Sequence, residues 1–361
     1  MEYKEELRNI TGILLEEEDH YGKMKKAVDD LYRLFQTVSG LEENNEKIRE
    51  DIFLPSGKAI GSFWAAACIK ELVRTKRYLR GVYKGIKQAQ TQFPGRQIHI
   101  LYAGTGPFAA LAVPLTTVFA SSEIKFTLLE INTESIRCLK RVIKSLQLED
   151  YIYEIVQCDA AEYRVNRDRP VHMIITETMQ NALKKEPQVA ITMNLAPQME
   201  EGGILVPECV FVSAALLDLK MDMDRIVGMT GDEEQYFHSL GEIFQLDKDI
   251  ATRCTDEDMQ TDGNRSFPWV EVDIPEGVES RFSQLCLFTA IRVFGGEELK
   301  YRECSLTMPL KLFDRDRAAD KVAFRYVLGD NPGFEYRVCP LPWKCTHQDK
   351  VNFISATNTG T

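Results

Sequence analysis

Apolar residues at helical spacing recur through about the first ninety positions of the chain, among many Glu and Lys residues. They include Ile10, Leu14, Leu15, Leu31, Leu34 and Phe35. A Leu-Pro-Ser-Gly break at 54–57 separates this stretch from a second helical pattern over 63–90, and a Phe-Pro-Gly turn follows at 93–95. The pattern therefore predicts an N-terminal helical region over residues 1–95.

After this region, short apolar runs alternate with helical segments. The apolar runs lie at 98–102, 126–131, 153–156, 172–175 and 204–206. Helices are expected over 108–119 and over 133–148, where Ile136 and Leu139 belong to one apolar face and Thr133 is the expected N-cap. Strands that alternate with helices are typical of an α/β parallel sheet covered on both faces. We assign this domain to residues 96–208.

The alternation stops beyond Pro207, and apolar runs then follow one another with Gly- and Asp-rich joints. The runs lie at 209–217, 285–294 and 322–327. This pattern predicts a β-rich, barrel-like C-terminal domain over 209–361, with a helical insertion around 222–245.

Composition narrows the classes of function. The chain has 44 Lys and Arg against 55 Asp and Glu, a net charge of −11, which argues against nucleic acid as the main partner. No run of about 20 apolar residues predicts a membrane span, and no signal peptide is visible at the N-terminus. The nine cysteines are scattered and form no Cys-x-x-Cys pair. We therefore expect reduced thiols in a cytoplasmic protein, with no metal site.

A glycine-containing turn follows the first predicted strand. Gly104 and Gly106 allow a ligand to approach the backbone closely, and the helix expected after Pro107 would offer unpaired N–H groups. The same turn is also compatible with an ordinary strand-to-helix connection. It lacks a third glycine, so a dinucleotide such as NAD is the less favoured ligand.

Acidic residues end the next two strands. Glu130 could accept hydrogen bonds from both ribose hydroxyls of an adenosine, and Asp159 could accept one from its adenine amino group. Either residue alone could equally be a solvent-exposed acid at a strand end. Because carboxyl ends of parallel strands meet at one edge of the sheet, the two acids and the glycines together predict a nucleoside-binding crevice there.

With these features, residues 98–207 resemble the class I S-adenosylmethionine-dependent methyltransferases, including a late helix, Gly202-Gly203 and a strand. The resemblance implies a Rossmann-like domain that binds S-adenosyl-L-methionine and releases S-adenosyl-L-homocysteine. It assigns the ribose to Glu130 and the adenine loop to Asp159. The cofactor-binding residues it implies in this domain are Ala103, Gly104, Thr105, Gly106, Glu130, Ile131, Asp159, Ala160 and Glu177.

Two further segments are similar to the protein arginine methyltransferases. Glu71-Leu72-Val73-Arg74-Thr75 precedes the first strand, and the resemblance implies that Arg74 binds the methionine carboxylate. Glu177 and Glu186 follow the fourth strand nine positions apart, as the two catalytic glutamates that hold a substrate guanidinium do in that family. The resemblance also implies a homodimer. His347, near Trp343, is a candidate base or an ordinary structural histidine.

The leading interpretation is a methyltransferase that acts on a nitrogen or oxygen nucleophile near Glu177. The acceptor is either a small molecule of the secondary-metabolite or siderophore type, or an arginine-like group of a peptide. Four alternatives remain: a protein arginine N-methyltransferase proper, aminocarboxypropyl transfer as in nicotianamine synthases, a non-catalytic S-adenosylmethionine-binding adaptor, and an NAD-dependent dehydrogenase.

Overall fold

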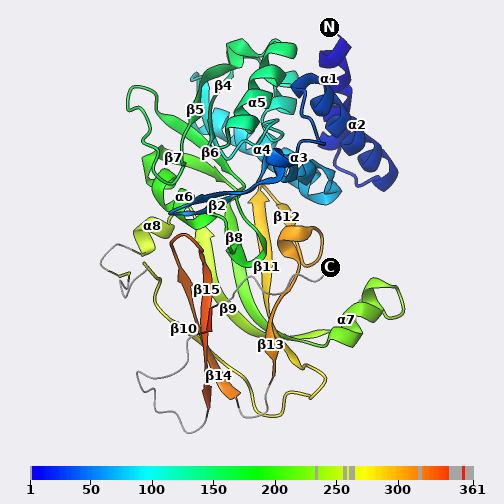
Figure 1. Cartoon of the computed structure of the whole chain (residues 1–361), viewed down its shortest axis with the longest axis vertical. Coiled ribbons are helices and arrows are strands. Elements are labelled where there is room, and N and C mark those ends of the chain that lie inside the picture. Colours follow the sequence, from blue (N-terminus) through cyan, green and yellow to red (C-terminus); the bar gives the residue numbers. More distant parts are fainter. Residues whose placement is uncertain are drawn as a thin grey trace.

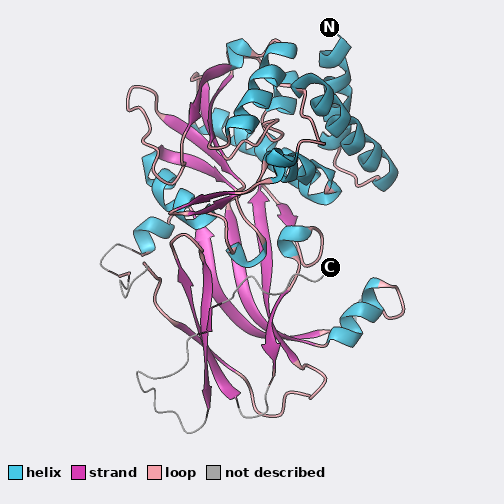
Figure 2. Ribbon diagram, in the orientation of Figure 1, coloured by secondary structure: helices cyan, strands magenta, loops and turns pink. Residues whose placement is uncertain are grey.

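The computed structural model describes residues 2–231, 235–254, 258–259, 265–315, 319–340 and 352–353. Helices cluster around a parallel sheet in one half of the molecule, and long antiparallel strands form the other half (Figures 1 and 2). Trp343 and His347, the late candidate site residues, lie outside the described part of the chain.

The N-terminal region is helical, as predicted, and Leu14, Leu31 and Phe35 are fully buried in it. The helix expected over 63–90 is interrupted at Glu71, which adopts an extended conformation (φ −80°, ψ 95°) as the N-cap of α4. The predicted break at 54–57 is the turn of a small hairpin. The elements are α1 (Glu2–Leu15), α2 (Tyr21–Ser39), η1 (Glu46–Arg49), β1 (Ile52–Leu54), β2 (Gly57–Ala59), α3 (Ser62–Ala67), η2 (Cys68–Lys70) and α4 (Leu72–Gln92).

All five strands predicted for the middle domain are present and form one parallel sheet in the order β5-β4-β3-β6-β7. Helices α4 and α5 contact one face of this sheet, and α6 packs on the opposite face. The expectation of a parallel sheet between helices is therefore confirmed. The elements are β3 (Ile98–Ala103), β4 (Ile124–Glu130), α5 (Thr133–Ser145), η4 (Glu149–Tyr151), β5 (Ile152–Gln157), β6 (Val171–Thr176), η5 (Asn181–Leu183), α6 (Gln188–Leu195), η6 (Ala196–Gln198) and β7 (Met199–Val206).

Two local predictions in this domain are wrong. Residues 108–119 form turns and the 3-10 helix η3 (Val113–Thr117), because Ala109 has a positive φ of 45° and Pro114 lacks the N–H that a helix interior needs. The glycine turn is therefore not followed by the α-helix N-terminus that the sequence predicted. The N-cap of α5 is Asn132 and not Thr133, since the Asn132 side chain accepts from the backbone N–H groups of the first turn.

The C-terminal region is β-rich, as predicted, and consists of two antiparallel sheets. The helical insertion expected over 222–245 is only partly correct, because Phe237–Asp247 pairs with β8 and satisfies the backbone groups of that strand. The sheets contain β12-β11-β8-β9, with β13 on β11, and β10-β14-β15-β16. The elements are β8 (Cys209–Leu217), α7 (Leu219–Ile226), β9 (Phe237–Asp247), α8 (Ile250–Arg253), β10 (Val270–Asp273), β11 (Gln284–Phe294), β12 (Glu297–Leu299), η7 (Ser305–Thr307), β13 (Leu310–Asp314), β14 (Ala319–Val327), β15 (Gly333–Pro340) and β16 (Asn352–Phe353).

A buried carboxylate joins the β-rich region to α4. Glu297 accepts hydrogen bonds from Arg80 Nε at 2.8 Å and from Lys84 Nζ at 2.6 Å, and Arg77 lies 3.5 Å away. Although burial opposes the shift, Lys84 and Arg80 lower the pKa of Glu297. This charged cluster fixes α4, which carries Arg74 in its first turn, against the second half of the molecule.

Candidate functional site

A cavity of about 630 Å³ lies at the carboxyl ends of the parallel strands. Its walls come from the β1–β2 hairpin, the segment from α3 to α4, the ends of β3, β4 and β6, and η7 of the β-rich region. Ala103 is fully buried in the core beneath it and does not line it. The other predicted site residues all line it: Arg74, Gly104, Thr105, Gly106, Glu130, Ile131, Asp159, Ala160, Glu177 and Glu186.

The glycine turn needs glycine at its first position. Gly104 has a φ of +72°, and a Cβ there would lie 2.3 Å from Cγ2 of Thr178. Its N–H donates to the Leu129 carbonyl at 2.9 Å, so the turn is tied to the neighbouring strand. Gly106 also has a positive φ, of 59°. The backbone can therefore run directly along the cavity without side chains in the way.

Glu130 is held rigidly by the backbone around it. Its Oε2 accepts from the N–H of Gly106 at 2.7 Å, and its Oε1 accepts from Ile131 and Asn132 at 2.8 Å each. Burial raises the pKa of Glu130, and these backbone hydrogen bonds oppose that rise. A carboxylate has about four acceptor positions, so roughly one is left for a ligand. Glu130 lines the cavity, and its binding of ribose hydroxyls stays a prediction.

Asp159 faces the same cavity from the next strand end. Its Oδ1 accepts from the Ala161 N–H at 2.8 Å, and its Oδ2 accepts from the Ser56 hydroxyl at 2.8 Å. Both oxygens keep further acceptor capacity toward the cavity. Asp159 can therefore accept a hydrogen bond from a ligand amino group while its orientation is fixed by the hairpin.

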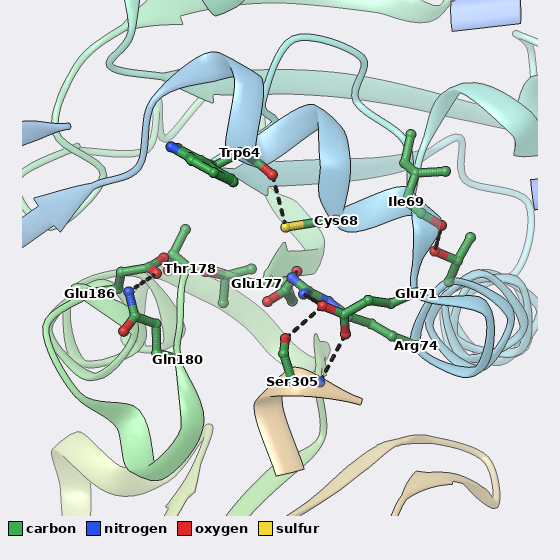
Figure 3. A network of polar contacts seen from close by, with 12 residues as sticks. Trp64, Cys68, Ile69, Glu71, Arg74, Glu177, Thr178, Gln180, Glu186 and Ser305 are labelled. Carbon is green, nitrogen blue, oxygen red and sulfur yellow. Dashed lines mark hydrogen bonds and ion pairs between the residues drawn. The ribbon is translucent and has the colours of Figure 1, made fainter. Parts of the chain in front are cut away.

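Arg74 forms the centre of a buried ion cluster (Figure 3). Its Nη2 donates to Oε2 of Glu177, and its Nη1 lies 3.4 Å from Oε1 of Glu71. Glu71 in turn accepts from the N–H of Ser305 at 3.0 Å and from its hydroxyl at 2.6 Å. Burial raises the pKa of Glu177, and the charge of Arg74 opposes that rise. In the structure the guanidinium expected to bind a ligand carboxylate is thus paired with a carboxylate of the protein.

Two buried oxygens beside this cluster have no hydrogen-bond partner among the described residues. They are Oε1 of Glu177 and the hydroxyl of Tyr78, and both residues line the cavity. A buried polar atom without a partner is costly, so such atoms are suited to hydrogen bonding with a bound ligand.

Glu186 lies in the same cavity as Glu177, so the structure brings the two predicted glutamates together. Glu186 is only 6% exposed, and its Oε1 accepts from Nε2 of Gln180 at 3.0 Å. Burial raises the pKa of Glu186 to about 7, although the hydrogen bond from Gln180 opposes the rise. Its charge therefore changes near neutral pH.

Several lining residues were not predicted. Ser305 and Leu306 come from the β-rich region, more than 230 positions after Glu71, and no local pattern marks them. Burial raises the pKa of the Cys68 thiol to about 11, so this thiol stays neutral. The other residues that were missed are Ser56, next to Asp159, and the lining residues Lys58, Trp64, Tyr78 and Tyr102.

The charge of the cavity is predominantly negative. Six carboxylates line it against two cationic side chains, Lys58 and Arg74. Within the described residues, no cluster of His, Cys, Asp and Glu is arranged to hold a metal ion. The electrostatics favour a ligand that carries positive charge.

Comparison with other proteins addresses the fold. No protein-family model and no curated protein sequence matches the chain. Separately, no helix among the described residues is long and apolar enough to cross a membrane.

The structure is similar to the Trypanosoma brucei PRMT1 enzyme–prozyme heterotetrameric complex with AdoHcy, with a TM-score of 0.50 and 12% sequence identity over 80% of this chain and 96% of that chain. The chain therefore has the class I methyltransferase fold in the architecture of the protein arginine methyltransferases, as the sequence predicted.

Proposed function

We propose that the chain binds S-adenosyl-L-methionine in this cavity and transfers its methyl group to a nitrogen or oxygen nucleophile. The observation that carries the proposal is that Arg74, Gly104, Glu130, Asp159 and Glu177, from five separate segments, line one cavity at the sheet edge. The structural neighbour from T. brucei was solved with AdoHcy, which supports the choice of ligand.

The residues fit the parts of this ligand. Glu130 has one acceptor position for a ribose hydroxyl, and Asp159 can accept from the adenine amino group. A guanidinium has five N–H donors, so Arg74 can hold the methionine carboxylate either beside Glu177 or in place of it. The excess of carboxylates matches the positive sulfonium, whose charge is lost when the methyl group leaves.

Glu177 and Glu186 would act on the acceptor. In the proposed reaction the lone pair of the acceptor attacks the methyl carbon, the C–S bonding pair goes to sulfur, and the acceptor loses a proton. Glu186 can take that proton because its pKa is raised to about 7 by burial. The acceptor is a small molecule or an arginine-like group of a peptide, and the negative cavity favours a cationic one.

A second candidate is a non-catalytic S-adenosylmethionine-binding adaptor, and the Arg74–Glu177 ion pair favours it. As long as Arg74 holds Glu177, the charge of this carboxylate is compensated and it is less available to an acceptor. Transfer of a radiolabelled methyl group to any acceptor that depends on Glu177 would decide for the enzyme.

We also propose that two copies of the chain associate through α7. This helix projects from the β-rich region (Figure 1), and Asp222 anchors it by accepting a hydrogen bond from Arg302 Nε at 3.0 Å. Its exposed apolar residues, with those that follow it, are Leu219, Met223, Ile226, Val227 and Met229. An apolar surface presented on a fixed arm is typical of a protein–protein contact. Analytical ultracentrifugation should give a dimer for the native chain and a monomer for Met223→Glu.

Calorimetry with S-adenosyl-L-homocysteine tests the ligand. We expect saturable binding, weakened at least about tenfold by Glu130→Gln, because a loss of 1.4 kcal/mol corresponds to that factor. Glu162→Gln, at an exposed carboxylate of the same domain, is the matched control and should bind as the native chain does. Absence of binding by the native chain, or equal binding by Glu130→Gln, would overturn the proposal.

A further inference from the structure

The β1–β2 hairpin joins the two ends of the cavity. At its turn the Ser56 hydroxyl donates to Oδ2 of Asp159 at 2.8 Å, at the end expected to hold the nucleoside. Two residues later, the Lys58 N–H donates to the Lys185 carbonyl at 2.9 Å, directly before Glu186. The hairpin crosses the molecule where the parallel sheet meets the β-rich region (Figure 1). One short element thus contacts both the nucleoside end and the acceptor loop at 177–187.

The turn of the hairpin fits a narrow slot. Gly57 has a φ of +133°, and a Cβ there would lie 2.8 Å from the Lys185 carbonyl oxygen and 3.1 Å from Cγ of Pro332. The Lys185 N–H also donates to the Pro332 carbonyl at 2.7 Å. The hairpin, the acceptor loop and the β-rich region therefore meet at Lys185, so displacement of the turn removes a contact from that loop.

The hairpin is also a wall of the cavity. Leu54, Lys58 and Ala59 line it together with Ile60, and Lys58 is ion-paired with Asp51. A ligand in the cavity contacts these residues only while the hairpin is docked. Because such a ligand makes more contacts with the docked hairpin than with a displaced one, it stabilises the docked state. Docking in turn preserves the Lys58–Lys185 hydrogen bond beside Glu186.

We propose that Ser56 is a positioning residue through which nucleoside binding at Asp159 orders the acceptor loop that carries Glu186. The proposal rests on the proposed function for the identity of the ligand. The contact between the hairpin and the acceptor loop does not depend on which ligand binds. Ser56 acts by holding the hairpin on Asp159, and it need not touch the acceptor. Binding of the methyl donor therefore favours assembly of the acceptor end.

Hydrogen–deuterium exchange on the full chain tests both the coupling between the hairpin and the acceptor loop and its use by the ligand. Without ligand, Ser56→Ala should speed exchange of the Lys58 amide, whose hydrogen bond to the Lys185 carbonyl needs the docked hairpin, and of the neighbouring Lys185 amide, which donates to Pro332. Ser56→Thr keeps a hydroxyl and should restore slow exchange. Ser145→Ala removes a hydroxyl that donates to the Val38 carbonyl outside the cavity, and should leave these amides unchanged. Equal exchange in Ser56→Ala and the native chain would overturn the coupling.

Addition of S-adenosyl-L-homocysteine tests whether the ligand uses this coupling. In the native chain we expect slower exchange both at 52–59 and at 181–186. In Ser56→Ala we expect affinity to fall at least about tenfold, because the hairpin loses its hydrogen bond to the charged Asp159 carboxylate. At saturation the protection of 181–186 should be largely lost, while 104–106 stays protected. Full protection of 181–186 in saturated Ser56→Ala would refute the inference. Failure of the native chain to bind would instead refute the proposed function, and the ligand-free comparison would still decide the coupling.

Discussion

Replacement of Glu186 by glutamine should stabilise the protein, and by an amount that depends on pH. Glu186 is 6% exposed, and burial raises its pKa from 4.5 to about 7. A folded-state pKa above the unfolded one means that the folded state binds more protons between these two values. Stability contributed by this group is therefore greatest at low pH and declines as pH rises from 4.5 to 7.

The size of the effect follows from the shift. Each pKa unit corresponds to about 1.36 kcal/mol, so the ionised Glu186 lowers the free energy of unfolding by about 3 kcal/mol at pH 8. At pH 5 most of the folded protein carries the protonated form, and the cost is about 1 kcal/mol. Glutamine is neutral at both pH values, and its carbonyl can still accept from Gln180.

Urea unfolding at pH 5 and pH 8 measures the difference. The free energy of unfolding of Glu186→Gln should exceed that of the native chain by about 1 kcal/mol at pH 5 and by about 3 kcal/mol at pH 8. Glu162→Gln, at an exposed position, controls for general effects of charge and should differ little at either pH. An equal difference at both pH values, or no stabilisation at pH 8, would refute the argument that burial makes this carboxylate costly.

Three further perturbations have defined outcomes. Arg74→Ala leaves the buried Glu177 uncompensated and should lower the free energy of unfolding by about 3–5 kcal/mol in urea, with partial recovery when Glu177→Gln is added. Gly104→Ala places a methyl group against Thr178 at a positive φ and should abolish calorimetric binding of S-adenosyl-L-homocysteine. Glu297→Ala removes the carboxylate that Arg80 and Lys84 share and should cost about 2–4 kcal/mol at pH 7. Because its pKa is lowered, the stabilisation from Glu297 is present above pH 4.5 and lost as pH falls below it, which thermal unfolding across pH should show.

The sequence predicted the parallel sheet well because its strands are continuous apolar runs, such as Ile98–Ala103, whose length and spacing are set by burial on both faces. It failed over 108–119, where apolar residues suit a helix but a positive φ at Ala109 and the proline at 114 turn the chain. The break at Glu71 also has no local signal. That residue is extended as the N-cap of α4, and its side chain is held by Ser305 from the other half of the molecule.

In the site, too, residues placed by a local pattern could be predicted, and residues placed by long-range contacts could not. Glu130 and Asp159 could be predicted because the carboxyl ends of neighbouring parallel strands always meet. Ser56 and Ser305 could not, since their partners lie 103 and 234 positions away and the contacts exist only after folding. The pairing of Arg74 with Glu177 was missed for the same reason, although both residues were identified.

A crystal structure of the chain with S-adenosyl-L-homocysteine tests whether this cavity binds the methyl donor. We expect the adenosine between Glu130 and Asp159 and the ligand carboxylate on the Arg74 guanidinium. Ligand bound outside this cavity, or bound in it with its carboxylate away from Arg74, would contradict the proposed function.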